Sequence, residues 1–399
     1  MALSQKDTNH VLQALRNGAV PDRGLETLAV GIDRQRGELR RLLDYVAGGE
    51  GEVKFLRGDY GCGKTFTARL AVLEAQRRGF ATAFTVVSAN DFHFHKFREV
   101  YEKVLSSLST PTCPEGALGD ILDRWIGNVE EMLIDGGSDP DAAGFDDEVG
   151  SRISAELASR THGTAPEEFV RVIQAIFAAK QRGDFAVASE LISWVSGSRT
   201  ASVDRAAKAA AGIKGEVTDT IALSFLRGIV EIIKQAGYAG LVIVVDEAET
   251  IMRMRRDVRA KSLNGMRQIV DNARQFPGLL WVFTGTPDFF ESRRGVAALP
   301  PLYDRIAFNE INGFASVQQP QLQLQPFDRE RLREVALKIR EVYPATDRAE
   351  FERKISVEFV DALIAATAVA HELPLFTVNP ADFDGIDHLH VHGPALGRL

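Results

Sequence analysis

Hydrophobic positions along the chain alternate between helical spacing and short unbroken runs. Leu39, Leu42, Leu43 and Val46 recur three or four residues apart, which predicts a helix over residues 33–46. Unbroken apolar runs, by contrast, are typical of strands that are buried on both faces. Such runs occupy residues 241–245 and 279–283, and runs interrupted by a single polar residue occupy 53–56 and 83–87. Because helical segments lie between these strands, we expect an α/β fold with a parallel sheet flanked by helices.

The same pattern divides the chain into segments of different character. Residues 1–50 are predicted to be helical, and the sheet is expected to come from two separate stretches. Between these stretches the chain is first acidic and then alanine-rich, with helices predicted over 169–179 and 186–195, which indicates a helical insertion. A short strand near 306–311 is expected to be the last of the sheet, and helices over 328–342 and 356–370 to form a C-terminal helical lid with an uncertain tail. The expected boundaries are 1–50, 51–109, 110–215, 216–325 and 326–399.

Composition narrows the class of protein. Hydrophobic residues make up 45% of the chain and charged residues 26%, as in soluble globular proteins. No apolar run is long enough to span a membrane, and the N-terminus lacks the pattern of a secretion signal. With only two cysteines, Cys62 and Cys113, a disulfide framework is excluded and a reducing cytoplasm is expected.

The charge of the chain is unevenly distributed. Its net charge is −8, and fourteen Asp/Glu against three Arg lie between Thr110 and Val170. This overall acidity argues against a protein that coats nucleic acid without specificity, although it leaves room for a local basic contact.

The strongest chemical signal lies directly after the first predicted strand. The sequence from Gly58 to Thr65 fits G-x-x-x-x-G-K-[ST], the phosphate-binding P-loop, and a helix is predicted to begin at Lys64. Glycines allow the backbone to wrap closely around phosphates, and the N-terminus of the helix adds positive potential. Lys64 is expected to reach the β- and γ-phosphates of ATP, and the Thr65 hydroxyl to ligate Mg²⁺. The expected nucleotide-binding residues are Gly58, Asp59, Tyr60, Gly61, Cys62, Gly63, Lys64, Thr65 and Phe66.

A second signal ends the third apolar run. Residues 241–245 lead into Asp246 and Glu247. At the end of a buried strand beside the P-loop, Asp246 can hold Mg²⁺ and Glu247 can polarise the attacking water. Many buried strands end in acids, so the specificity comes from the combination with the P-loop. Together the two motifs predict ATP hydrolysis with Glu247 and Lys64 as catalytic residues.

Two further polar residues complete the predicted site, each with a simpler alternative. Thr284 follows the run at 279–283 and is positioned to hydrogen-bond the attacking water or the γ-phosphate; the alternative is a turn residue that caps the strand. Arg305 precedes the predicted last strand and is a candidate arginine finger that reaches the nucleotide of a neighbouring subunit. The alternative for Arg305 is an ion pair with Asp304 or another acid.

A basic segment lies between these elements, from Met252 to Arg274. It is a candidate contact for DNA phosphates or for an acidic neighbour, and the alternative is a solvated helix face. It carries Arg253, Arg255, Arg256, Arg259, Lys261, Arg267 and Arg274 against Asp257 and Asp271.

The order of these motifs resembles the AAA+ class of P-loop NTPases, in its origin-recognition-like branch. In that class Gly58–Thr65 corresponds to Walker A, Asp246 and Glu247 to Walker B, Thr284 to sensor 1 and Arg305 to the finger. The segment from Val30 to Gln35 resembles the one that precedes the first strand near the adenine, and Gln325–Asp328 resembles the entry to the lid. Longer strings, such as KFLRGDYGCGKTF, VIVVDEAETIMRMRRDVRAKSLNGMRQIVD and FTGTPDFFESRRGVAALPPLYDRI, resemble the ATP-binding BrxD family of bacteriophage-exclusion (BREX) defence loci.

This resemblance implies an ATPase that uses ATP and Mg²⁺, forms a homo-oligomer and works with partner proteins of a defence system. Two departures stand out. Lys64 and Asp246 are further apart than in a minimal AAA+ domain, which the insertion explains, and residues 373–399 lack an evident sensor-2 arginine. An ATP-binding scaffold with little turnover remains an alternative to a switch or motor. A small-molecule or nucleotide kinase fits less well, because the acidic pair suits the activation of water better.

Overall fold

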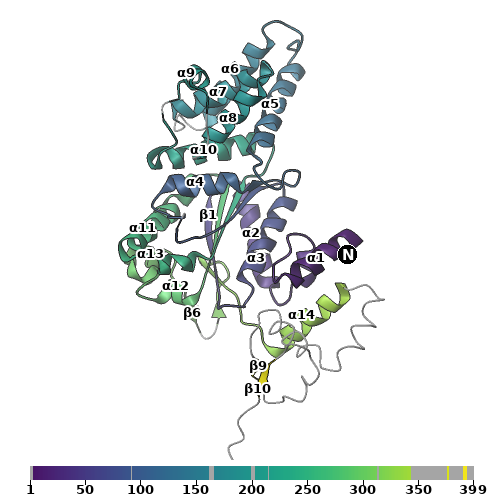
Figure 1. The fold of residues 1–399 in the computed structure, drawn as a ribbon, viewed down its shortest axis with the longest axis vertical. Coiled ribbons are helices and arrows are strands. Elements are labelled where there is room, and N and C mark those ends of the chain that lie inside the picture. The colour runs from purple at the N-terminus through teal and green to yellow at the C-terminus, as the bar shows by residue number, and fades with distance from the viewer. Residues whose placement is uncertain are drawn as a thin grey trace, which may run out of the picture. The chain divides into compact units, whose positions relative to one another are not determined.

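The computed structural model describes residues 3–90, 92–160, 166–198, 203–213, 215–311, 314–342, 375–376 and 390–392 (Figure 1). The chain forms two compact units, one comprising Met1–Asp33 with Gln325–Leu399 and the other Arg34–Leu324. Within the described residues, no helix combines the length and the apolarity that crossing a membrane requires.

A six-stranded sheet forms the centre of the unit Arg34–Leu324, in the order β3-β2-β4-β5-β1-β8. All neighbouring strands run parallel except β3, which pairs antiparallel with β2 at one edge. The predicted sheet is therefore confirmed as α/β, with one antiparallel edge that was not predicted. Its strands are β1 (Glu52–Arg57), β2 (Ala81–Val86), β3 (Leu108–Ser109), β4 (Leu241–Asp246), β5 (Leu279–Gly285) and β8 (Gln321–Gln323).

Helices cover both faces of this sheet, which explains why the central strands β4 and β5 are almost entirely apolar. On one face, Val282 and its equivalents on the other strands pack against α2 (Asp33–Ala47) and α3 (Lys64–Arg77). On the other face, Trp281 and its equivalents pack against α4 (Phe97–Ser106), α10 (Asp219–Gln235) and α11 (Arg256–Asn272) (Figure 1). Successive side chains of a strand thus enter different hydrophobic clusters.

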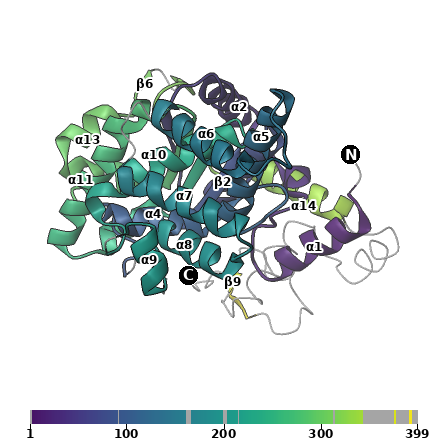
Figure 2. The same ribbon diagram turned by 90° about the horizontal axis from the view of Figure 1, so that it is seen from above.

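In the described part of the chain, five helices lie between β3 and α10 in the sequence, and residues of α5–α8 share one hydrophobic cluster with α10 (Figure 2). The ring of Phe169 packs closely against Gly228 of α10. A Cβ built on this glycine would come within 2.5 Å of the ring. The helices are α5 (Leu118–Asp135), α6 (Phe145–Arg160), α7 (Glu167–Gln181), α8 (Phe185–Val195) and α9 (Arg205–Ala210).

The predicted last strand is wrong. Residues Glu310–Ile311 form β6, which pairs only with β7 (Phe314–Ala315) in a separate ribbon. The strand beside β1 is instead β8, Gln321–Gln323, whose central Leu322 is buried. The apolar residues that begin at Ile306 predicted a strand more strongly than the sequence of β8 does. In the structure, however, the buried Ile306 is the C-cap of α13 (Pro300–Arg305) and does not enter a strand.

The other unit contains α1 (Gln5–Arg16), η1 (Leu25–Leu28) and α14 (Arg329–Val342). The Ser4 side chain caps α1 by accepting a hydrogen bond of 3.1 Å from the Asp7 amide. The Lys338 ammonium of α14 donates to the Ala29 carbonyl. The helix expected over residues 356–370 lies outside the described residues, and so does most of the stretch 373–399, of which β9 (Leu375–Phe376) and β10 (Val391–His392) are described.

Besides α13, β6 and β7, the described part of the sheet-containing unit has four other short elements. They are η2 (Ala248–Arg253), η3 (Ala273–Gln275), α12 (Pro287–Glu291) and η4 (Val296–Ala298).

Candidate functional site

The Gly-rich loop connects the end of β1 to the start of α3, as its sequence predicts. Gly61 and Gly63 adopt positive φ angles of 80° and 85°, which favour glycine. Gly58 is needed for a different reason, since a Cβ built on it would lie 2.3 Å from Sγ of Cys62 and 3.2 Å from Cβ of Leu324. The loop is therefore folded tightly over its own Cys62, and burial raises the pKa of that thiol.

Lys64 is folded back into this loop. Its ammonium Nζ donates to the carbonyl oxygens of Gly58 at 3.0 Å and Asp59 at 3.1 Å. The ring of Tyr60 lies 5.0 Å from the same atom, within the range of a cation–π interaction. The side chain of Lys64 is only 9% exposed, whereas Tyr60 is 75% exposed. The loop thus holds a nearly buried cation at the N-terminus of α3, a position whose positive potential suits an anionic group.

Asp246 is joined to two threonine hydroxyls from different elements. Thr65 of α3 donates to Oδ2 at 2.7 Å, and Thr284 of β5 donates to Oδ1 at 2.5 Å. The register explains this meeting, because Val245 pairs with Phe283 and the next residue on each strand is Asp246 or Thr284. With Asp246 only 3% exposed, both carboxylate oxygens are bound by hydroxyl donors in the protein interior.

Glu247 is held in an unusual backbone conformation. Its φ of 58° is positive, alone among the non-glycine residues that the structure describes. Its amide donates to Oγ1 of Thr284 at 2.9 Å, while its side chain is exposed. A left-handed conformation costs a residue with a Cβ roughly 1–2 kcal/mol. The hydrogen bond to Thr284 therefore fixes a strained turn from which the carboxylate of Glu247 projects into solvent.

Glu249 is a site residue that the sequence reasoning missed. Its Oε1 lies 3.8 Å from Nζ of Lys64, and its side chain is only 7% exposed. Its Oε2 is buried without a hydrogen-bond partner in the described part of the chain. Burial raises the pKa of the Glu249 carboxyl, and the charge of Lys64 opposes this shift. The only signal in the sequence was a second acid two residues after Glu247, which does not by itself indicate burial.

The oxygen atoms at this site fit a hard divalent cation. Among the described residues, no cluster of three or more His, Cys, Asp or Glu side chains is arranged to hold a metal ion. Mg²⁺ does not require such a cluster, because it keeps several waters and binds phosphate oxygens with one or two protein ligands. The Thr65 hydroxyl and the Asp246 carboxylate, in contact at 2.7 Å, provide such a pair of ligands.

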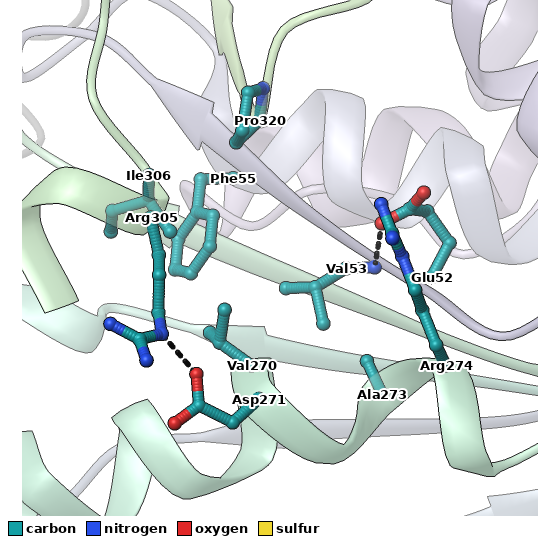
Figure 3. A pocket seen from close by; sticks show the side chains of 10 residues that line it. All are labelled: Glu52, Val53, Phe55, Val270, Asp271, Ala273, Arg274, Arg305, Ile306 and Pro320. Carbon is teal, nitrogen blue, oxygen red and sulfur yellow. Dashed lines mark hydrogen bonds and ion pairs between the residues drawn. The ribbon is translucent and has the colours of Figure 1, made fainter. Parts of the chain in front are cut away.

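Arg305 is the last residue of α13 and lines a cavity with residues of β1 and α11 (Figure 3). Its guanidinium forms an ion pair with Asp271 of α11 and donates to the Pro301 carbonyl. The acid that pairs with Arg305 is thus Asp271 and not its neighbour Asp304. The side chain remains 42% exposed, so this pairing is accessible to solvent.

The basic segment that follows Asp246 extends to a second loop. Arg253 and Arg255 are exposed, and Arg294 of the loop after α12 donates to the Met252 carbonyl at 2.9 Å. This contact brings Arg293 and Arg294, both exposed, beside the start of the basic segment. Sequence reasoning had assigned no role to these two arginines.

A protein-family model described as BREX system ATP-binding protein BrxC/D matches residues 3–373 of the chain. Comparison with curated proteins and with solved structures gives no match.

Proposed function

The chain belongs to the family of BREX system ATP-binding proteins BrxC/D, and on this premise we propose that it is an AAA+ ATPase that hydrolyses ATP with Mg²⁺. In this proposal it acts as a nucleotide-driven switch or motor component of BREX-type bacteriophage defence. The observation that carries the proposal is the double hydrogen bond to Asp246, from Thr65 at 2.7 Å and from Thr284 at 2.5 Å. It joins the ends of three elements around a carboxylate that is suited to a metal bound to phosphate.

Each residue of the site has a role in this proposal. Lys64 exchanges the carbonyls of Gly58 and Asp59 for the β- and γ-phosphates. Thr65 and Asp246 hold Mg²⁺, which neutralises charge on the phosphates during transfer. Glu247 accepts a hydrogen bond from the attacking water and polarises it. Its exposed side chain and the hydrogen bond from its amide to Thr284 support this role, since the carboxylate can meet water while the backbone is anchored to β5.

Thr284 is assigned a positioning role. Its hydroxyl donates to Asp246 and accepts from the Glu247 amide. These two hydrogen bonds connect Asp246, the proposed metal ligand, to Glu247, which is proposed to activate water. A threonine that serves only as a strand cap would make no such pair of contacts.

Arg305 is proposed to act on the nucleotide of a second copy of the chain. The helix-covered sheet, the position of Arg305 at the exposed end of α13 and its distance in sequence from the P-loop support an AAA+ assembly in which the finger acts in trans. Arg305 would leave Asp271 when it meets a γ-phosphate. The oligomer is therefore expected to form, or to tighten, when ATP binds.

Two contacts support the alternative of a scaffold with little turnover. Lys64 lies beside Glu249, and Arg305 is paired with Asp271, so an isolated chain has neither cation free for phosphate. Turnover then depends on assembly, and a chain that assembles without catalysis would behave as a scaffold. An ATPase and a scaffold are distinguished by the rate of ATP hydrolysis, measured above the concentration at which the chain assembles.

A nucleic-acid contact is proposed for the exposed arginines around Met252. Arg253 and Arg255 come from the segment after the Asp246 strand, and Arg293 and Arg294 from the loop after the Thr284 strand. Arginine side chains pair well with phosphates, and both segments lead directly from the proposed catalytic strands. DNA is thus the partner whose binding would be coupled most directly to ATP hydrolysis.

The test of the proposed function uses two variants. Lys64→Ala removes the cation of the P-loop and is expected to abolish tight ATP binding, measured by calorimetry on the folded protein. Glu247→Gln keeps the shape of the side chain and is expected to bind ATP but to hydrolyse it roughly 10²-fold more slowly or worse. Unchanged affinity in the first variant refutes the assignment of the site, and wild-type turnover in the second refutes the catalytic role of Glu247.

A further inference from the structure

A cavity of about 340 Å³ opens beside Arg305, between β1, the end of α11 and the end of α13 (Figure 3). Its floor is apolar and includes Phe55 and Ile306, which are 0% and 1% exposed. Arg305 and Arg274 stand on opposite sides of it (Figure 3). The cavity therefore combines an apolar interior with two arginines, Arg274 and Arg305, and two acids, Glu52 and Asp271.

The two arginines differ in their pairing. Arg305 is bound to Asp271, as described above. Arg274 is exposed and forms no ion pair or hydrogen bond with another residue of the described part of the chain, although Glu52 also lines the cavity. A ligand suited to this site would carry a large apolar group for the floor and an acidic group for Arg274.

The P-loop carries both groups side by side. Tyr60 is 75% exposed, the highest value among the exposed large hydrophobic side chains that the structure describes, and the adjacent Asp59 is also exposed. Aromatic residues at the centre of an interface contribute much of its binding energy. The same chain thus presents a projecting group and a cavity of matching chemistry.

The proposed trans finger brings these two features together, and the inference rests on that proposal. The Asp59 carbonyl lies 3.1 Å from Nζ of Lys64, the atom assigned to the β- and γ-phosphates. An Arg305 guanidinium that reaches this γ-phosphate from a second copy must come close to Asp59 and Tyr60. The cavity beside Arg305 then faces the exposed tyrosine of the neighbour.

We propose that Tyr60 of one copy inserts into the Arg305 cavity of the next copy, with Asp59 facing Arg274. ATP favours this contact because Lys64 and Arg305 leave their partners in the free chain and bind the phosphates instead. When Lys64 moves to the phosphates it releases the ring of Tyr60, which it holds at 5.0 Å in the free chain. The projecting group and the cavity lie on different surfaces of one chain, so the contact is head-to-tail and closes into a ring or continues as a filament.

The test measures self-association by sedimentation with a non-hydrolysable ATP analogue, and the affinity for the analogue by calorimetry. Tyr60→Ala and Arg274→Glu are expected to weaken self-association by about tenfold or more. Arg274→Glu, which lies outside the P-loop, should in addition keep the analogue affinity within a few-fold of wild type. Phe185→Ala is the matched control, because Phe185 is 71% exposed but lies at the start of α8, away from the cavity. It should associate like wild type.

A charge exchange tests the pairing itself. Asp59→Lys is expected to weaken association, and the double variant Asp59→Lys/Arg274→Glu to recover it at least partly, since the two charges are exchanged across the contact. Arg274→Glu is informative even if a change at Tyr60 disturbs the P-loop, because Arg274 does not belong to that loop.

The outcomes separate this inference from the proposed function. If the wild type assembles with ATP analogue while Tyr60→Ala and Arg274→Glu assemble equally well, the Tyr60 contact is refuted and the trans finger stands. If the wild type stays monomeric at every concentration and still hydrolyses ATP, the trans finger and this contact are both refuted, while the assignment of ATP hydrolysis stands.

Discussion

Replacing Glu249 by glutamine should increase the affinity for ATP. In the free chain the buried Glu249 carboxylate lies 3.8 Å from Nζ of Lys64, so under the proposed role of Lys64 it would compete with phosphate for this cation. It also adds a negative charge beside a site that must accept a polyanion. Glutamine keeps the size of the side chain but removes the charge, so both obstacles to nucleotide binding are reduced.

The magnitude follows from the distance. Two unit charges about 4 Å apart interact by roughly 4 kcal/mol at an effective dielectric constant of about 20. Lys64 keeps its two carbonyl partners in the variant, and the bound phosphates are themselves screened by Mg²⁺, so only part of this energy is gained. About a third of it, near 1.4 kcal/mol, corresponds to a tenfold lower dissociation constant.

Calorimetry with a non-hydrolysable ATP analogue at fixed Mg²⁺ measures this change. Glu247→Gln is the matched control, because it removes one charge from the same segment, but from an exposed side chain that does not contact Lys64. Its analogue affinity should stay within a few-fold of wild type. An unchanged or weaker affinity in Glu249→Gln would show that Glu249 supports nucleotide binding instead of opposing it, and would refute the reasoning.

Three further predictions follow from the contacts described above. Arg305→Ala should keep ATP affinity within a few-fold and lose about 10³-fold in turnover; mixing it with Lys64→Ala should partly restore the rate, and full activity of the single variant would contradict the finger. Glu74 is held at a pKa of about 2 by hydrogen bonds from Arg40, against the effect of burial. Its contribution to stability, about 3 kcal/mol, is fully present above pH 4.5 and is lost as the pH falls from 4.5 towards 2; urea unfolding of Glu74→Gln should show a shallower loss over this range. Arg293→Glu should weaken the binding of a fluorescent DNA oligonucleotide severalfold at low salt and leave ATP affinity unchanged, and undiminished DNA binding would exclude this loop.

The sequence predicted the centre of the sheet well because local and tertiary requirements agree there. The run before Asp246 is apolar at every position, and β4 is buried throughout, so burial on both faces is recorded directly in the residue types. The helix after the P-loop was predicted over Lys64–Arg77 and is confirmed with the same bounds. The P-loop motif also correctly predicted that Lys64 begins this helix. The catalytic roles of Lys64 and Glu247 remain predictions.

Other elements were missed for specific physical reasons. Strand β8 lies at the sheet edge, where the polar Gln321 and Gln323 pair with β1, so its sequence lacks an apolar run. Helix α5 carries buried residues such as Trp125 and Val129 at helical spacing, but the acids on its exposed side dominated the composition. Glu249 could not be found from the sequence, since its proximity to Lys64 arises from tertiary packing.

The close approach of Phe169 to Gly228 has a consequence for how this unit unfolds. Helix α10 contributes to the same hydrophobic cluster as the sheet and as α5–α8, so neither side can be removed without exposing apolar surface on α10. The helical segment is continuous in sequence but is not energetically independent of the sheet. We therefore expect the residues Arg34–Leu324 to melt in one cooperative transition. A destabilising change in the helical segment is also expected to destabilise β4, the strand that directly follows α10 and ends in Asp246.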